Sequence, residues 1–277
     1  SAASDVYKRQ IFYTSLYHTM IDPRCFSDCD GRYIGADKKI HQTKNFTYRT
    51  VFSGWDVFRS QFPLQTLINP RLVNDEINSL IQIAQLSGTE YYPRWEVVNA
   101  YSGCMLGNPA ISVLADAYEK GIREYDVQKA VEYAANTQKQ FGNGDLGYTP
   151  GSLSHTLEYA YTDWCLGQLM SSLGKKKEAA EYEKRAKAYR NVWCDSVQWF
   201  RARVKGGGWL PWRGRTAQDQ GTTESNPFQQ GWFVPHDIDG MKALMGGQKK
   251  FDAELEEFFA NVPVSYTHLR AHETVLD

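Results

Sequence analysis

The 277-residue sequence contains no run of about 18 apolar residues, and its first ten residues hold no apolar core of a signal peptide. It therefore predicts neither a membrane helix nor a signal peptide within itself. The sequence also has no large excess of charge of one sign, because 31 Lys and Arg nearly balance 32 Asp and Glu. A nearly neutral protein is poorly suited to nucleic acid or to an anionic membrane surface, so we expect a neutral partner.

Cysteine motifs are missing too. The five cysteines, at positions 25, 29, 104, 165 and 194, include no Cys-x-x-Cys pair and no histidine at zinc-like spacing. This excludes the usual structural zinc motifs. An odd count is untypical of a disulfide framework, although a bridge between Cys25 and Cys29 stays open. The string DCDGRY begins like an EF-hand loop but has no glutamate at its twelfth position.

Helical periodicity dominates what is present. Apolar residues recur every three or four positions, which predicts helices over 11–21, 55–68, 70–86, 109–121, 126–141, 153–173, 175–193, 235–244 and 249–259. Asn108 is expected to cap the helix that starts at Pro109, and Asp126 the helix after it. From 198 to 230 the pattern is irregular, and WFRARVKGGGWLPW predicts a short β excursion before a long loop.

Short turns join these helices in pairs, whereas the loops between pairs are long and rich in glycine and aromatic residues. Long ordered loops gathered at one end of a scaffold usually carry binding and catalysis. An all-α toroid fits this pattern better than a solenoid, because no period of about 34 to 45 residues recurs. We expect a helical domain over 11–263. Segments 1–10 and 264–277 are expected to be a non-native leader and tail, because neither continues its neighbour's apolar face.

Aromatic residues are abundant, with 8 Trp and 17 Tyr. Their rings stack on the apolar faces of sugars, and the polar tips of Tyr and Trp form hydrogen bonds. A large aromatic core explains the same composition. Composition alone therefore only favours carbohydrate as the partner.

Five strings carry a family resemblance: FYTSLYHTMIDPRCFSDCDGRYIG, FSGWDVFR, WEVVNAYSGCMLGN, HTLEYAYTDWC and TESNPFQQGWFVPHDIDG. In order and spacing they resemble glycoside hydrolase family 92, the calcium-dependent exo-α-mannosidases, over residues 11–263. The resemblance implies an N-terminal β-sandwich and an (α/α)6 catalytic barrel. It also implies a Ca²⁺ cofactor beside the sugar, and hydrolysis of terminal α-mannosides with inversion.

Two family motifs are missing from the sequence. These are the Asp-Cys-Gly-Gln string, which holds the base carboxylates, and the Asn-Glu-Pro string. Nine predicted helices are also fewer than the twelve of an (α/α)6 barrel. The resemblance therefore implies an incomplete (α/α)6 toroid with long loops at one end, lacking the β-sandwich and the C-terminal part of the barrel. The expected parent is a periplasmic or secreted bacterial enzyme acting on mannose-containing oligosaccharides, with its calcium ligands in this chain unknown.

Inversion needs one carboxylic acid and a second carboxylate about 6.5 to 9.5 Å away. The resemblance makes Glu224 the acid, since TTESN matches the family's Thr-Glu-Gly-Asn string. The aromatic residues Phe228, Trp232 and Phe233 are expected to form an apolar wall that favours its protonated form. Glu224 is alternatively a surface-loop residue or a cap partner. Asp237 and Asp239 point about 200° apart on a helix, and Asp237 is interpreted mainly as a helix-start residue.

The expected sugar-binding pair is Trp55 and Asp56, which the resemblance places in the terminal mannose pocket. An indole supplies a stacking face and a carboxylate accepts hydrogen bonds from vicinal hydroxyls. Asp56 could equally be an ordinary first-turn residue favoured by the helix dipole. Arg59 is a further candidate that either contacts sugar or clamps Asp56, and Glu96 is another pocket candidate.

Glu158 and Asp163 are expected to line the barrel as hydrogen-bond partners rather than to catalyse. Tyr101 stands where the family has a second glutamate in its string. Two alternatives to a truncated mannosidase stay open. Another (α/α)6 glycosidase, trehalase- or glucoamylase-like, needs a second carboxylate here and no calcium, whereas a non-catalytic carbohydrate-binding helical domain needs only the aromatic residues. If the chain is truncated, we also expect that it is inactive on its own, that it exposes apolar surface and that it tends to associate.

Overall fold

The computed structural model describes residues 2–261 of the chain. Within this range, residue contacts define two compact units. The first unit comprises residues 2–144 and 158–186, and the second comprises 145–157 and 187–261. The predicted non-native tail, 264–277, lies outside the described residues.

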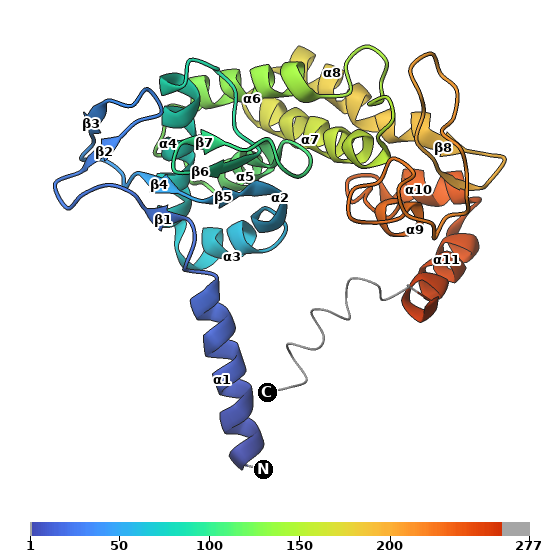
Figure 1. Cartoon of the computed structure of the whole chain (residues 1–277), viewed down its shortest axis with the longest axis horizontal. Coiled ribbons are helices and arrows are strands. Elements are labelled where there is room, and N and C mark those ends of the chain that lie inside the picture. Colours follow the sequence, from blue (N-terminus) through green and yellow to red (C-terminus); the bar gives the residue numbers. More distant parts are fainter. Residues whose placement is uncertain (1, 262–277) are drawn as a thin grey trace. The chain divides into compact units, whose positions relative to one another are not determined.

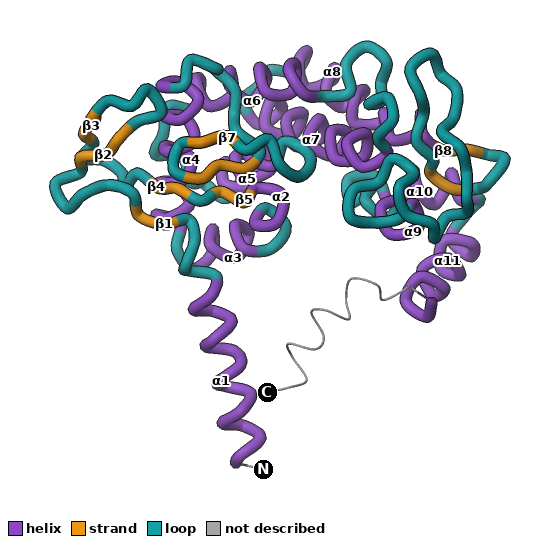
Figure 2. Tube along the Cα trace, in the orientation of Figure 1, coloured by secondary structure: helices purple, strands orange, loops and turns teal. Residues whose placement is uncertain are grey.

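Helices make up most of the first unit (Figures 1 and 2). They are α1 (Ala2–His18), α2 (Gly54–Val57), α3 (Gln61–Ile68), α4 (Pro70–Leu86), α5 (Pro109–Glu119), α6 (Val127–Phe141), most of α7 (Leu153–Ser172) and α8 (Lys176–Ala186). Its short strands are β1 (Arg24–Cys25), β2 (Arg32–Ile34), β3 (Ile40–Gln42), β4 (Arg49–Thr50), β5 (Phe52–Ser53), β6 (Trp95–Val97) and β7 (Ala100–Tyr101). They pair antiparallel as β1-β4, β2-β3 and β5-β6-β7.

The second unit contains the first turn of α7 and then a 3-10 helix, Lys187–Val192. The hairpin of β8 (Trp193–Cys194) and β9 (Trp199–Phe200) follows, and then α9 (Pro227–Gln230), α10 (Ile238–Met245) and α11 (Gln248–Asn261). The predicted β excursion is confirmed by this hairpin and by an isolated bridge between Arg203 and Trp209. Among the described residues, no helix is both long and apolar enough to cross a bilayer.

Several predicted boundaries are wrong. The helix expected over 55–68 breaks into α2 and α3, and the helix expected over 175–193 ends at Ala186 and continues as a 3-10 turn. α1 begins at Ala2, so the predicted leader residues 2–10 are helical, while their non-native origin stays a prediction. The strands between 24 and 53 and between 95 and 101 were not predicted, because segments of two or three residues carry no measurable alternation.

One of the two predicted helix caps is confirmed, and the other is wrong. The Asp126 carboxylate accepts a hydrogen bond from the Lys129 N–H at 3.0 Å, which confirms the predicted cap of α6. The Asn108 side chain does not cap α5. Its Nδ2 instead donates to Gln138 Oε1 at 2.8 Å, because both side chains are buried and each needs a partner.

The core of the first unit holds a buried polar network around Gln138 on α6. Its Oε1 accepts from Asn108 and from the Thr162 hydroxyl (3.2 Å), and its Nε2 donates to the Tyr159 carbonyl at 3.0 Å. One side chain thus joins the start of α5 to α6 and α7.

Close packing of α7 on α8 depends on Gly167, where an added Cβ would lie 3.3 Å from the Tyr182 Cβ.

Aromatic rings form the core of the second unit. Trp199 and Phe228 lie with their ring centroids 5.4 Å apart, and Trp232 and Phe258 pack beside them at 5.4 to 5.7 Å. Arg215 covers Phe228 and pairs with Glu254 and Glu257 on α11. Much of the aromatic content is therefore core, as the alternative to sugar binding held.

Two further expectations concern the surface. Exposed apolar side chains were predicted, and on α1 they include Val6, Tyr7, Ile11, Phe12, Tyr13 and Tyr17. Association of the chain stays a prediction. All five cysteines are free, so the open question of a Cys25–Cys29 bridge is answered by two reduced, exposed thiols.

We predict that Gln138→Leu lowers the free energy of unfolding by about 2 to 3 kcal/mol, because Asn108 and the Tyr159 carbonyl lose their partner inside the core. Chemical denaturation measures this. Gln140→Leu, an exposed change on the same helix, is the control and should shift stability by less than about 0.5 kcal/mol. Equal effects of the two substitutions would contradict the network's role.

Candidate functional site

The β5-β6-β7 sheet positions the predicted sugar-binding residues of the first unit. Ser53 pairs with Trp95 across β5 and β6, and α2 starts directly afterwards at Gly54. A Cβ at Gly54 would lie 2.4 Å from the Pro109 Cγ and 2.6 Å from the Arg94 carbonyl oxygen, so only glycine fits. This close approach places α2, with Trp55, against the start of α5.

Glu158 on α7 fixes two of the predicted residues. Its buried Oε1 accepts from Trp55 Nε1 at 3.0 Å and from Arg59 Nη2 at 2.9 Å. Burial raises the pKa of the Glu158 carboxyl, opposed by the Arg59 charge and the hydrogen bonds from Trp55 and Arg59. Gly107, at φ +69°, leaves room for this carboxylate, since an added Cβ would lie 3.2 Å from Glu158 Oε2. As expected, Glu158 is a hydrogen-bond partner.

Asp56 remains exposed beside these groups. Its Oδ2 accepts from the Ser53 hydroxyl at 2.5 Å. The predicted alternative in which Arg59 clamps Asp56 is not what the structure shows. The Arg59 guanidinium instead bonds Glu158 and the Trp55 carbonyl, and it lies 5.3 Å from the centroid of the Trp55 ring.

Glu96 faces the interior under the same sheet. Its Oε1 accepts from the Thr50 hydroxyl (2.8 Å) and the Asn99 N–H (2.5 Å), and its Oε2 accepts from the Val51 N–H (3.1 Å). Burial raises the pKa of Glu96, and these hydrogen bonds partly offset it. Both oxygens are thus engaged by the chain, so the geometry gives Glu96 a bracing role, and a sugar contact stays a prediction.

A third buried glutamate, Glu76 on α4, was missed by sequence reasoning. Burial, together with the nearby Glu96 charge, raises the pKa of Glu76 to about 8, and Arg49 counteracts this only partly. Glu76 lies three residues after Val73 and four before Leu80, on the apolar stripe of the helix. An acidic residue on such a stripe is the sequence signal that could have identified it.

Glu224 lies in the second unit, in a tight turn before α9. Its φ is +51°, the Thr222 hydroxyl donates to the Ser225 carbonyl at 2.6 Å, and the Thr223 N–H donates to Ser154 Oγ at 3.0 Å. The expected apolar wall is wrong for the described residues. Glu224 is exposed, whereas the Phe228 and Trp232 rings pack in the core.

Asp237 caps α10, as predicted: its Oδ1 accepts from the Gly240 N–H at 2.9 Å and its Oδ2 from the Tyr189 hydroxyl at 2.5 Å. Burial alone would raise its pKa, but hydrogen bonds from Tyr189, Gly240 and Arg190 together hold the pKa of Asp237 below its usual value. A carboxylate committed in this way is a structural group. Asp239, by contrast, is exposed.

The expected calcium ion was tested against the donor set. Among residues 2–261, no three acidic, histidine or cysteine side chains converge on a position that could hold a metal. Calcium also binds backbone and amide carbonyl oxygens, so the calcium cofactor stays a prediction.

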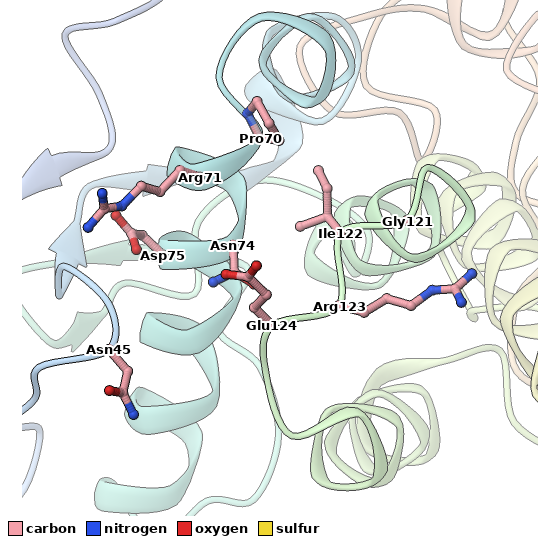
Figure 3. A pocket seen from close by; sticks show the side chains of 9 residues that line it. All are labelled: Asn45, Pro70, Arg71, Asn74, Asp75, Gly121, Ile122, Arg123 and Glu124. Carbon is pink, nitrogen blue, oxygen red and sulfur yellow. The ribbon is translucent and has the colours of Figure 1, made fainter.

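Three of the cavities on the described part of the first unit are lined by no predicted site residue. One, of about 490 Å³, lies between the first turns of α4 and the loop after α5 (Figure 3). Its lining includes Arg71, Asn74, Asp75, Arg123 and Glu124. The candidate sugar-binding groups lie instead around the β5-α2 junction.

A model of the glycosyl hydrolase family 92 catalytic domain matches residues 2–274. The chain belongs to this family. Membership favours a family 92 glycosidase over a trehalase- or glucoamylase-like enzyme. Together with the solved structures described next, it confirms the predicted helical-barrel fold class. The non-native origin of segments 1–10 and 264–277 stays a prediction.

Solved members of family 92 are similar in structure. A family GH92 α-mannosidase from Bacteroides thetaiotaomicron has a TM-score of 0.86 and 32% identity, covering 90% of this chain and 35% of that one. A second enzyme from this bacterium, described as a family GH92 inverting mannosidase, has a TM-score of 0.81 and 32% identity, covering 89% and 36%. An uncharacterized secreted glycosidase of Arthroderma benhamiae is 29% identical over 198 residues, 54% of this chain and 26% of that protein. This family member thus spans about a third of the length of the solved enzymes.

We predict that stability falls as pH rises from about 5 to 8. The pKa of Glu76 is about 8 in the folded chain and about 4.3 for an unfolded glutamate. The folded state therefore holds a proton that the unfolded state releases, and raising the pH favours unfolding.

Glu76→Gln should flatten this dependence when the free energy of unfolding is measured at several pH values. Glu132→Gln, an exposed change on α6, is the matched control and should leave the slope unchanged. An equal slope in wild type and Glu76→Gln would show that Glu76 ionises normally.

Proposed function

We propose that this chain is part of an exo-acting, inverting α-mannosidase and supplies residues that bind the terminal mannose. The observation that carries the proposal is an exposed Asp56 that directly follows Trp55 in α2, where Glu158 holds the side chains of Trp55 and Arg59. An exposed carboxylate accepts hydrogen bonds from vicinal sugar hydroxyls. The family's α-mannosidase structures support mannose as that sugar.

The proposed acid is Glu224, which would protonate the leaving oxygen while a second carboxylate activates water on the opposite face of the sugar. The turn at positive φ holds Glu224 outside the aromatic core of its unit, where a glycosidic oxygen can approach. The described residues offer no partner that we assign as base. Asp237 is committed to its cap, so we propose that the base belongs to a longer form of the enzyme.

Calcium dependence is part of this proposal for the longer enzyme only. Since the described acidic side chains do not converge on a metal position, its ligands would have to include other groups. A chelator tests this dependence. Loss of activity of the longer enzyme with chelator supports a calcium cofactor, and full activity contradicts it.

We predict that Glu224→Gln lowers mannose release from α-1,2-mannobiose by about 10²- to 10⁴-fold in an enzyme form that includes the β-sandwich and the remaining barrel. The amide cannot donate the proton that the leaving oxygen needs. Asp219→Asn, which changes a nearby exposed carboxylate, is the control and should retain activity.

The present chain, assayed alone, should release no mannose. Release by the chain alone would mean that it already contains a base. Activity of Glu224→Gln close to wild type would remove Glu224 from the acid role.

A further inference from the structure

Two indole rings, Trp55 and Trp95, border the exposed carboxylate of Asp56, and they are held in different ways. Trp55 donates its N–H to the buried Glu158, and the Arg59 guanidinium lies 5.3 Å from the centroid of its ring. One face of Trp55 is therefore already in contact with a cation. Its indole serves to join α2 to α7.

Trp95 is partly buried on β6, and its N–H donates to Ser53 Oγ at 2.7 Å. None of the aromatic rings or guanidinium groups in residues 2–261 stacks on it. Because an indole has only one polar hydrogen, the committed ring offers apolar surface alone. The part of the indole that stays exposed can contact the C–H face of a pyranose.

Ser53 connects this ring to Asp56. Its hydroxyl donates to Asp56 Oδ2 at 2.5 Å while it accepts from Trp95, so one oxygen fixes both groups. A serine hydroxyl has one hydrogen and two acceptor positions, which allows both bonds at once. The other oxygen, Oδ1, accepts no hydrogen bond from the described residues.

We propose that Trp95, rather than Trp55, supplies the stacking face, and that Ser53 is a positioning residue that couples Trp95 to Asp56 as one sugar-binding element. The expected ligand is a neutral hexopyranoside with two adjacent free hydroxyls, such as a terminal mannose. The hydroxyls reach Asp56 Oδ1 while the C–H face of the ring lies on Trp95. This inference rests on the proposed function, since it assigns roles within the same site.

The first test needs no ligand. With ¹⁵N-labelled tryptophan, the Trp95 indole N–H signal is assigned from its loss in Trp95→Phe. It should shift and exchange faster with water in Ser53→Ala, and it should also shift in Asp56→Asn because the Ser53 hydroxyl loses its charged acceptor. Ser60→Ala, an exposed change at the start of α3, is the control. An unmoved Trp95 signal in Asp56→Asn would overturn the coupling.

The second test is titration with methyl α-D-mannopyranoside. Ser53→Ala should weaken binding about tenfold, as for loss of a hydrogen bond to a charged group, whereas Ser53→Thr, which keeps the hydroxyl, should bind within about twofold of wild type. If Ser53 acts through Asp56, the double variant Ser53→Ala/Asp56→Asn binds no more weakly than Asp56→Asn. Fully additive losses would contradict a positioning role.

Trp95→Leu separates the inference from the proposed function. A wild-type chain that fails to bind the mannoside would overturn the proposed function, and this assignment with it. A wild-type chain that binds, and keeps its affinity in Trp95→Leu, would overturn only the assignment of Trp95. Thermal unfolding midpoints confirm that each variant is folded at the titration temperature.

Discussion

A carboxylate removed from water must be given hydrogen-bond donors or a positive charge, and Glu158 meets this requirement with Trp55 and Arg59. The same requirement explains the backbone around it. Gly107 leaves space for the carboxylate, and Gly54 lets α2 approach the start of α5 closely enough for Trp55 to reach it. The buried carboxylate therefore determines where the proposed sugar-binding groups lie.

The acidic residues of the first unit divide into two classes by burial. Glu96 and Asp163 are buried and paired, Glu96 with three donors and Asp163 with Arg185 Nε at 3.1 Å. Burial raises the pKa of Asp163 to about 7 against the opposing Arg185 charge. Such groups rigidify the scaffold, whereas Asp56 keeps an oxygen for a ligand. A binding surface needs both buried and exposed acidic groups, because exposed side chains hold their geometry only when buried partners support them.

Sequence reasoning succeeded where the determining interaction is local. The Asp126 and Asp237 caps each depend on an N–H three residues away, and helical periodicity identified α4 to α7. It failed where a partner lies far along the chain. Arg59 bonds Glu158, 99 residues later, and nothing near Arg59 indicates that partner rather than Asp56.

The candidate site shows the same limit. Motif resemblance selected Trp55, Asp56 and Glu96, but the direction of a side chain depends on packing that no motif encodes. Glu96 lies inward, where Thr50, Val51 and Asn99 present donors. The aromatic residues after Glu224 pack into a core that also needs α11. Family membership and helical architecture could thus be predicted, while the division of roles among neighbouring residues needed the structure.

The most direct test of this account is a crystal structure of the chain with methyl α-D-mannopyranoside. The account predicts one sugar at the β5-α2 junction, with adjacent hydroxyls within hydrogen-bond distance of Asp56 and its C–H face on Trp95. Trp55 and Arg59 should remain bonded to Glu158. A sugar bound only in the polar cavity between α4 and the loop after α5, with the β5-α2 junction empty, would contradict it.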